Sequence, residues 1–273
     1  MSSEFTEEQI LFFKDFLLKH SGYNLVIGKE YLLQSRLKIV LDMHKLDNYN
    51  AIMNALRFHP HGDIATDVIE AMTVNETFFF RDDKPFEMFE NSILPRLAEA
   101  NDGNTIRIWS GASSTGQEPY SVAISLEEAR KKYTSLKYEI DASDINNRIL
   151  AKARKGHYSE MEINRGLDPK FKDKYFDHVD NEWVVKQEIK NKITFFRQNL
   201  RDEFKQSRGP YDLIFLRNVL IYFDADTKNE VLAKTVKMMR PGGVLILGVS
   251  ENVYDLSLGL KKNNNTTGIY IKE

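Results

Sequence analysis

The apolar positions of the first 72 residues recur at the three- and four-residue spacing of helices. Three groups show this spacing: Ile10, Phe13, Phe16 and Leu17; Leu33, Leu37, Val40 and Leu41; and Ile64, Val68 and Met72. Thr6 and Gln9 match the capping box that begins a helix, and Gly22 is a candidate helix end. Another helix is expected to begin near Asn48. Since no strand pattern interrupts these segments, the spacing predicts a small all-helical domain over residues 1–72.

From about residue 104 the pattern changes to short apolar runs separated by helical stretches. The runs read TIRIW, KYEIDASD, YDLIFLRN and GGVLILGVSE, and the helical stretches between them include residues 118–133 and 225–239. Strands that alternate with helices form right-handed βαβ units. The sequence therefore predicts an α/β domain with a mostly parallel sheet over residues 91–273, and a linker at residues 73–90.

One insertion breaks this alternation at about residues 172–197. Two turn pairs, Asp180-Asn181 and Lys190-Asn191, flank strand-like runs there. This arrangement predicts a small antiparallel sheet attached to the larger domain.

Composition and charge narrow the classes of function. The 38 basic and 40 acidic residues give a net charge of −2, which argues against a protein that grips nucleic-acid phosphates. With no cysteine, disulfides, cysteine-ligated zinc and thiol nucleophiles are excluded, and no metal site is predicted. No apolar stretch approaches the roughly 18 residues of a membrane span, and the acidic start lacks the order of a signal peptide. A cytoplasmic protein without membrane insertion is expected.

The stretch WSGASSTGQEPYS at 109–121 is a strand end that runs into a small, polar loop. Ligands of open α/β sheets bind at the carboxyl ends of strands, and small residues allow close approach to the backbone. Gly111 and Gly116 lack the middle glycine of a dinucleotide-binding loop. A tight strand-to-helix turn without a ligand explains the loop about equally well.

Two carboxylates add information on the ligand. Asp144 ends the second predicted strand, 33 residues after Gly111, where a carboxylate can accept hydrogen bonds from both ribose hydroxyls. Glu118 opens the helix after the loop and would disfavour a phosphate but suit a positive centre. A cationic, ribose-bearing cofactor such as S-adenosylmethionine fits both. The alternative for Asp144 is an N-cap of the following helix.

At this level of detail the chain resembles the CheR-type chemotaxis receptor methyltransferases, which are glutamate O-methyltransferases. Five separate blocks carry the resemblance: NETFFFR at 75–81, WSGASSTGQEPYS at 109–121, ASDIN at 142–146, RQNL at 197–200 and LRNVLIYF at 216–223. Their order and spacing cover nearly the whole chain. The departures are Ser113-Ser114 in place of a pair such as Ala-Cys, Gln117 in place of Glu, and Asn146 in place of Asp.

The resemblance implies a Rossmann-like SAM-dependent methyltransferase domain and a role for ten residues. The cofactor would be S-adenosyl-L-methionine, with S-adenosyl-L-homocysteine as product. The implied cofactor-binding residues are Asn75, Thr77, Arg81, Glu118, Asp144, Asn199, Leu200, Arg217 and Asn218. Asn75, Thr77 and Arg81 would close over the cofactor from the linker, and Asn199 with Leu200 would flank its adenine. Arg81 and Tyr222 would lie nearest the transferred methyl group and are the implied catalytic residues.

Each of these assignments has a structural alternative. The Phe78–Phe80 run is expected to pack between the domains, and Glu251 is expected to be structural. Arg81 could instead form an interdomain salt bridge. Tyr222 could belong to the core, since the residues around it are apolar.

The implied reaction moves a methyl group to a glutamate side chain of a receptor, which serves sensory adaptation. The acceptor carboxylate has a reference pKa of about 4.3, so it is ionised at neutral pH and needs no general base. Two alternatives stay open: a methyltransferase with a different substrate, and a non-catalytic SAM-binding sensor or scaffold.

The partners implied are the cytoplasmic signalling helices of chemoreceptors. The stretch 25–45 is locally basic, with Lys29, Arg36, Lys38 and Lys45 against Glu30 and Asp42, and is expected to face them. In some family members the small sheet binds a receptor C-terminal tail peptide through a longer, glycine-containing hairpin. Because HVDNEW at 178–183 is short and lacks glycine, no dependence on such a tail is expected.

Overall fold

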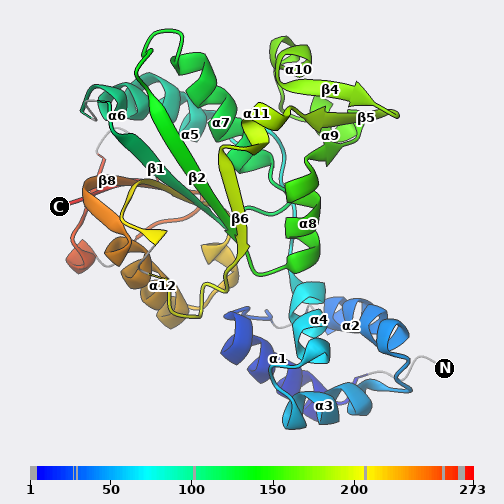
Figure 1. Ribbon diagram of the computed structural model, residues 1–273. Coiled ribbons are helices and arrows are strands. Elements are labelled where there is room, and N and C mark those ends of the chain that lie inside the picture. Colours follow the sequence, from blue (N-terminus) through cyan, green and yellow to red (C-terminus); the bar gives the residue numbers. More distant parts are fainter. Residues whose placement is uncertain are drawn as a thin grey trace.

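The computed structural model describes residues 5–26, 28, 30–100, 103–205, 208–253, 256–263 and 268–273. Four helices form its N-terminal unit (Figure 1). They are α1 (Glu7–Ser21), α2 (Glu30–His44), α3 (Tyr49–Phe58) and α4 (Asp63–Met72). Thr6 and Gln9 form the predicted capping box, and Gly22 ends α1 in the left-handed conformation at φ 76°. The Asn48 side chain caps α3. The helical prediction is therefore confirmed.

The helical unit has its own apolar core. The predicted apolar positions supply most of it, among them Phe13, Leu17, Leu33, Leu37, Val68 and Met72. Arg36 has a structural role in this unit, because its Nη1 donates to the carbonyl oxygens of Ala71 (2.9 Å) and Thr73 (2.6 Å). These contacts satisfy carbonyl groups at the end of α4 that have no partner within the helix.

A seven-stranded sheet forms the second unit, and five of its strands are parallel. In spatial order they are β6 (Ile193–Arg197), β2 (Lys137–Asp144), β1 (Thr105–Gly111), β7 (Tyr211–Leu216) and β8 (Met239–Leu247). The edge pair β10 (Ile269–Lys272) and β9 (Leu260–Lys262) completes the sheet, with β10 antiparallel to both neighbours. The α/β class with a mostly parallel sheet is confirmed.

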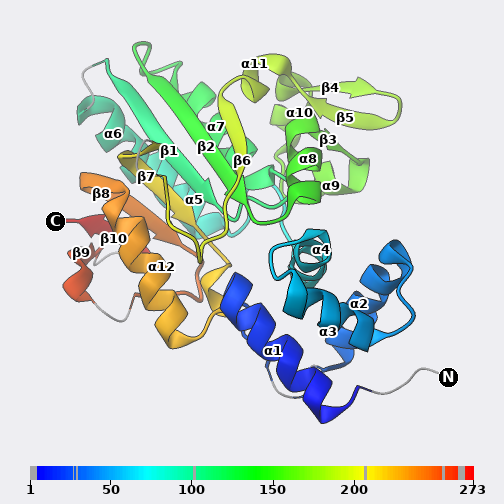
Figure 2. The same cartoon turned by 60° about the horizontal axis from the view of Figure 1, so that its bottom comes forward.

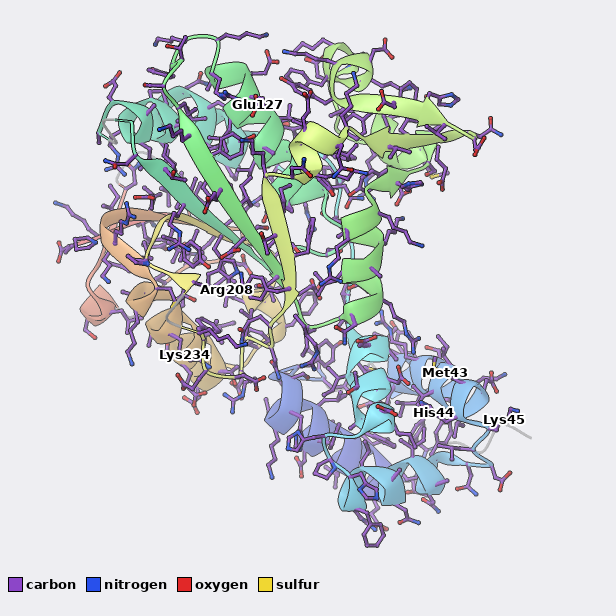
Figure 3. All side chains as sticks on the ribbon, viewed as in Figure 1. Met43, His44, Lys45, Glu127, Arg208 and Lys234 are labelled. Atoms are coloured by element: carbon purple, nitrogen blue, oxygen red, sulfur yellow. The ribbon has the colours of Figure 1, made fainter. Side chains whose placement is uncertain are left out.

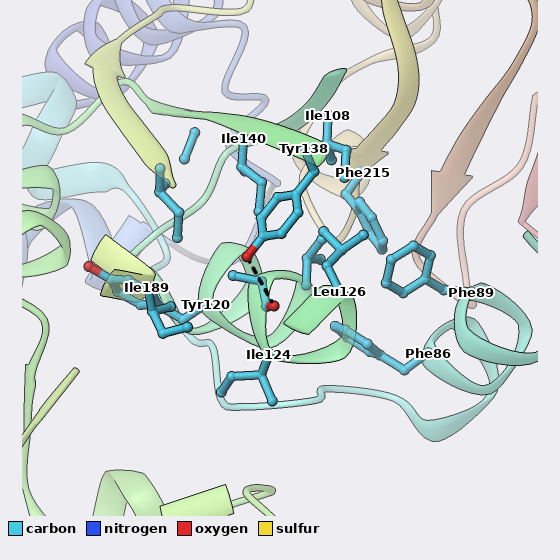
Figure 4. Close-up of a cluster of buried hydrophobic side chains, with 14 of the residues drawn as sticks. Phe86, Phe89, Ile108, Tyr120, Ile124, Leu126, Tyr138, Ile140, Ile189 and Phe215 are labelled. Atoms are coloured by element: carbon cyan, nitrogen blue, oxygen red, sulfur yellow. Dashed lines mark hydrogen bonds between the residues drawn. The ribbon is translucent and has the colours of Figure 1, made fainter. Parts of the chain in front are cut away.

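Helices cover both faces of this sheet (Figures 1 and 2). One face carries α5 (Asp83–Met88), the π-helical turn η1 (Phe89–Ile93), α6 (Leu94–Ala100) and α7 (Gln117–Ala129), and the other carries α12 (Ala225–Lys237). Successive strand residues serve opposite cores. Ile108 packs with Phe86 and Phe89 (Figure 4), whereas Trp109 packs on the α12 side. This alternation positions the strand ends between two rigid layers.

The small antiparallel sheet consists of β3 (His157–Tyr158), β5 (Glu182–Val185) and β4 (Phe176–Val179). The short helices α9 (Glu160–Asn164) and α10 (Pro169–Tyr175) pack on it, whereas α8 (Asn147–Lys155) contacts β2 and β6 of the main sheet and α11 (Gln187–Lys190) contacts α7. The expected limits of about 172–197 differ from this arrangement. Residues 193–197 pair in parallel with β2 in the main sheet, and 157–158 join the small one. As expected, Asp180 and Asn181 close a tight hairpin, with φ values of 48° and 65°.

The linker that follows α4 packs against the small sheet. Phe79 is fully buried, with its ring centroid 5.0 Å from that of Tyr158 and 5.5 Å from that of Phe176. Gly166 has a φ of +93°, and a Cβ there would lie 1.9 Å from the Phe79 carbonyl oxygen. Phe79 therefore joins the sheet unit to the small sheet, and does not pack against the helical unit as the expectation of interdomain packing implied.

Candidate functional site

The carboxyl ends of β1, β2, β6 and β7 meet on one side of a pocket at the point where strand order reverses. The pocket is open to solvent, and its empty space is about 1010 Å³ when the open part is counted. All ten residues implied by the sequence line it: Asn75, Thr77, Arg81, Glu118, Asp144, Asn199, Leu200, Arg217, Asn218 and Tyr222. The helical unit supplies a further wall, which includes Tyr23, Ile69 and Met72.

The loop after β1 has an unusual backbone. Ala112, Ser114 and Gly116 all have positive φ values, of 58°, 51° and 95°. At Gly116 a Cβ would lie 3.0 Å from the Tyr158 hydroxyl oxygen, so the position needs glycine for both conformation and space. Strained backbone at non-glycine residues is often found at functional sites. The loop is thus a tight strand-to-helix turn that also lines the pocket.

Asp144 holds this loop to the end of β2. Its Oδ2 accepts from the backbone N–H of Ser114 at 2.9 Å, and its Oδ1 accepts from that of Asn146 at 3.0 Å. Burial raises the pKa of Asp144, although these backbone hydrogen bonds act in the opposite direction. The N-cap alternative for Asp144 is wrong, because Asn146 caps α8 by accepting from Arg148 N–H and Ile149 N–H.

Glu118 and Arg217 form a buried ion pair at the opposite side of the loop. Glu118 Oε2 accepts from Arg217 Nη1 at 3.0 Å, and Glu118 Oε1 accepts from the Ser110 hydroxyl at 2.8 Å. Arg217 Nη2 also donates to the Arg81 carbonyl oxygen (2.6 Å) and to Asp82 Oδ2 (2.9 Å). Burial raises the pKa of Glu118, while Arg217 and Ser110 oppose the shift. The pair therefore presents a carboxylate to the pocket from a fixed position.

Two polar atoms at this pocket are buried without a partner. Within the described part of the chain, neither Ser113 Oγ nor Arg217 Nε has a hydrogen bond. Buried polar groups in folded proteins are almost always satisfied. Both residues line the pocket, but these two atoms have no exposed surface, so they lie behind the pocket wall and are not open contacts for a ligand.

The linker lies over the same loop. The Asn75 carbonyl oxygen accepts from the Ser114 hydroxyl at 3.0 Å, and Arg81 Nη1 donates to the Glu76 carbonyl oxygen at 2.5 Å. The Glu76 carboxylate instead pairs with Arg165 at 2.6 Å. In the described residues no carboxylate lies within ion-pair distance of Arg81, so the predicted alternative of an interdomain salt bridge is not observed.

The loop after β7 carries the remaining residues from the carboxyl edge. Asn218 has a φ of 56°, and its N–H donates to Glu251 Oε2 at 2.7 Å. The same oxygen accepts from Gly248 N–H at 2.8 Å, which confirms the structural interpretation of Glu251. Tyr222 closes the 3-10 turn Leu220–Tyr222 and lies half-buried at the pocket wall, not inside the core.

The segment after β6 forms the floor near α1. Asn199 Nδ2 donates to the His20 carbonyl oxygen at 2.7 Å, and Asn199 Oδ1 accepts from Arg201 N–H at 3.0 Å. Lys234, labelled in Figure 3 on α12, donates to the Leu200 carbonyl oxygen at 2.9 Å. Both polar atoms of the Asn199 side chain therefore bond to protein groups, which hold this residue in position in the pocket wall.

Tyr23 and Ser113 are two of the pocket residues that the sequence patterns did not select. Tyr23 follows the glycine that ends α1 and belongs to none of the five motif blocks. Its position just after a helix end was the one sequence signal that could have selected it. Ser113 was inside a quoted block, but its type there differed from the family pattern. In the described residues no cluster of three or more potential metal ligands occurs, and no helix there could cross a membrane.

Comparison with known proteins gives a consistent result along the chain. Residues 8–73 match the model of the CheR methyltransferase all-alpha domain, and residues 75–269 match that of the CheR methyltransferase SAM binding domain. The chain is 37% identical over 243 residues to chemotaxis protein methyltransferase Cher2 of Pseudomonas putida, with 88% of each chain covered. It is 38% identical over 248 residues to chemotaxis protein methyltransferase 1 of Pseudomonas aeruginosa, covering 89% of this chain and 90% of that one.

Proposed function

Because this chain belongs to the CheR methyltransferase family, we propose that it transfers methyl groups from S-adenosylmethionine to glutamate side chains of chemotaxis receptors, forming methyl esters. It has a SAM-binding methyltransferase domain and is related to chemotaxis methyltransferases over most of its length. The observation that carries the proposal is the convergence of all ten implied residues on one pocket.

The pocket fits the cofactor by its chemistry. Glu118 would receive the cofactor's ammonium group, and Asp144 would accept from its ribose hydroxyls. Leu200, with 6% of its surface exposed, provides an apolar contact for the adenine beside Asn199. When bound, the cofactor supplies an electrophilic methyl group on a positively charged sulfur.

Arg81 and Tyr222 would serve the acceptor. A glutamate with a pKa of about 4.3 arrives ionised, so these residues need only orient its carboxylate and exclude water. A new C–O bond forms as the C–S bond breaks, and the negative and positive charges both disappear. Water stabilises separated charges, so a site closed by the linker favours this step.

The helical unit would meet the receptor. We propose the division into residues 1–72, a linker at 73–90 and a catalytic domain at 91–273, with receptor helices reaching the pocket beside the helical unit. Of the basic residues expected to contact the receptor, Arg36 is engaged with α4, whereas Lys38 is exposed, and Lys29 lies outside the described residues. A cytoplasmic location would follow from this partner.

Transfer of labelled methyl groups to receptor-containing membranes tests the proposal. We expect protein-bound label that mild alkali releases as methanol, since esters hydrolyse under these conditions. Arg81→Ala should abolish most transfer while melting normally. Arg165→Ala, which removes a neighbouring exposed guanidinium, is the matched control and should remain active. Label that resists alkali would indicate another substrate, and cofactor binding without any transfer would indicate a scaffold.

A further inference from the structure

The turn between α1 and α2 is docked against the Tyr222 loop (Figure 2). Gly22 is buried at a φ of +76°, and a Cβ there would lie 2.9 Å from Thr227 Cγ2 and 3.2 Å from Phe223 Cδ1. The next residue but one, Asn24, donates its N–H to the Tyr222 carbonyl oxygen at 2.8 Å. The residue between them, Tyr23, is therefore held in a defined position by backbone contacts on both sides.

Tyr23 faces Tyr222 across the pocket wall. The two rings stack, with centroids 6.0 Å apart and planes at 21°, and both line the cofactor pocket. In the described part of the chain neither phenol oxygen has a hydrogen-bond partner. Both side chains are half-buried, and neither hydroxyl is among the fully buried polar atoms, so both remain accessible from the pocket. Two hydrogen-bonding groups from different units of the protein thus remain available to a ligand.

The charged and hydrogen-bonding groups around these two hydroxyls indicate the charge of the ligand that would bind there. Burial raises the pKa of Tyr222; Tyr23, Glu76 and Glu251 add to the shift, and Arg81 opposes it. The two carboxylates already have partners, since Glu76 pairs with Arg165 and Glu251 accepts from backbone N–H groups. Burial likewise raises the pKa of Tyr23. Both phenols are therefore neutral donors at physiological pH, beside a guanidinium that has no acceptor capacity. A cluster that offers donors suits an anion.

We propose that Tyr23 is an acceptor-binding residue, which donates its hydroxyl to the carboxylate of the receptor glutamate together with Tyr222 and Arg81. The proposal rests on the proposed function, because the carboxylate is that of the methyl acceptor. The cofactor end of the pocket has the opposite character, since Glu118 and Asp144 present carboxylates there. The helical unit would then complete the active site as well as meet the receptor.

Tyr23→Phe tests this inference, because it removes the hydroxyl and keeps the stacked ring. The matched control is Tyr133→Phe, whose hydroxyl has no hydrogen bond within the described residues and lies outside the pocket and the helical unit. Steady-state methylation of receptor membranes gives kcat and KM, and calorimetry with S-adenosylhomocysteine gives a dissociation constant. Loss of one hydrogen bond to a charged group predicts a fall in kcat/KM for the receptor of about tenfold or more. Cofactor affinity and melting temperature should match those of Tyr133→Phe.

Two outcomes would overturn the assignment. Receptor kinetics of Tyr23→Phe equal to those of Tyr133→Phe would show that the Tyr23 hydroxyl does not contact the acceptor. An equal loss of S-adenosylhomocysteine affinity would assign Tyr23 to the cofactor instead. An inactive wild-type protein would contradict the proposed function and this inference together, whereas an active wild type with an unaffected Tyr23→Phe contradicts this inference alone.

Discussion

The guanidinium of Arg217 donates to the carboxylate of Glu118 at 3.0 Å, and the Arg217 side chain has no exposed surface. The same guanidinium pairs with Asp82 at 2.9 Å, so one cation joins the linker to the first turn of α7. The ion pair therefore fixes the carboxylate at the cofactor pocket and attaches the linker above it.

Replacing Arg217 should destabilise the protein strongly. Arg217→Met leaves two carboxylates without their buried partner, and removal of one member of a buried pair costs about 3–5 kcal/mol. Glu118→Gln removes a charge but keeps the shape, and should cost less. Urea denaturation measures both. A loss below about 1 kcal/mol for Arg217→Met would show that the pair is more hydrated than its geometry indicates.

Cofactor binding should weaken as the pH falls. Burial raises the pKa of Glu118 above its ordinary 4.5, so the carboxylate is neutralised at a higher pH than an exposed one. A neutral carboxyl holds an ammonium group poorly, and affinity should decline as the pH drops through this raised pKa. Calorimetry with S-adenosylhomocysteine between neutral and acid pH checks the trend. Glu118→Gln should bind more weakly at neutral pH with a flatter profile, and an unchanged profile would exclude Glu118 as the titrating group.

Asp144 should affect both binding and folding. Asp144→Ala removes the acceptor of two buried N–H groups, each worth about 1–3 kcal/mol when left unsatisfied, and should also weaken S-adenosylhomocysteine binding about tenfold or more. Asp141→Ala is the matched control on the same strand. Asp141 bonds Arg208 (3.0 Å) and the Tyr211 hydroxyl (2.7 Å) outside the pocket, so its loss should reduce stability alone. Wild-type affinity in folded Asp144→Ala would remove Asp144 from the site.

The small sheet should not bind receptor tail peptides. Its β4–β5 hairpin is closed by the two-residue turn at Asp180 and Asn181, which leaves little room for a docked strand near its end. Titration with the C-terminal peptides of receptors from the same organism should give no saturable binding. Micromolar binding to any of them would contradict this prediction, and would assign the exposed strand edge a partner by β-augmentation.

The parts of the fold that follow local chemistry could be predicted from the sequence. The Thr6–Gln9 capping box and the glycine after α1 each depend on a few neighbouring residues, and both occur where predicted. The carboxyl-edge position of Asp144 follows from the rule that parallel strands place their ends together.

Features that depend on distant contacts could not be predicted. β3 has only two residues and therefore no periodicity, and nothing local indicates that residues 193–197 pair with β2. From the sequence, Arg36 was expected to face the receptor. In the structure its guanidinium donates to a carbonyl oxygen at the end of α4. Tyr23 lies at the site because the helical unit docks against the Tyr222 loop. The spacing of residues along the chain does not indicate that contact.

The most direct test of the proposed glutamate methylation is to locate the transferred methyl group. Receptor membranes incubated with the protein and labelled S-adenosylmethionine can be digested and mapped by mass spectrometry before and after mild alkali. We expect methyl groups on glutamate side chains of the cytoplasmic signalling helices, lost as methanol on alkali treatment and absent with Arg81→Ala. Methyl groups on nitrogen atoms, or none on the receptor with active cofactor binding, would contradict it.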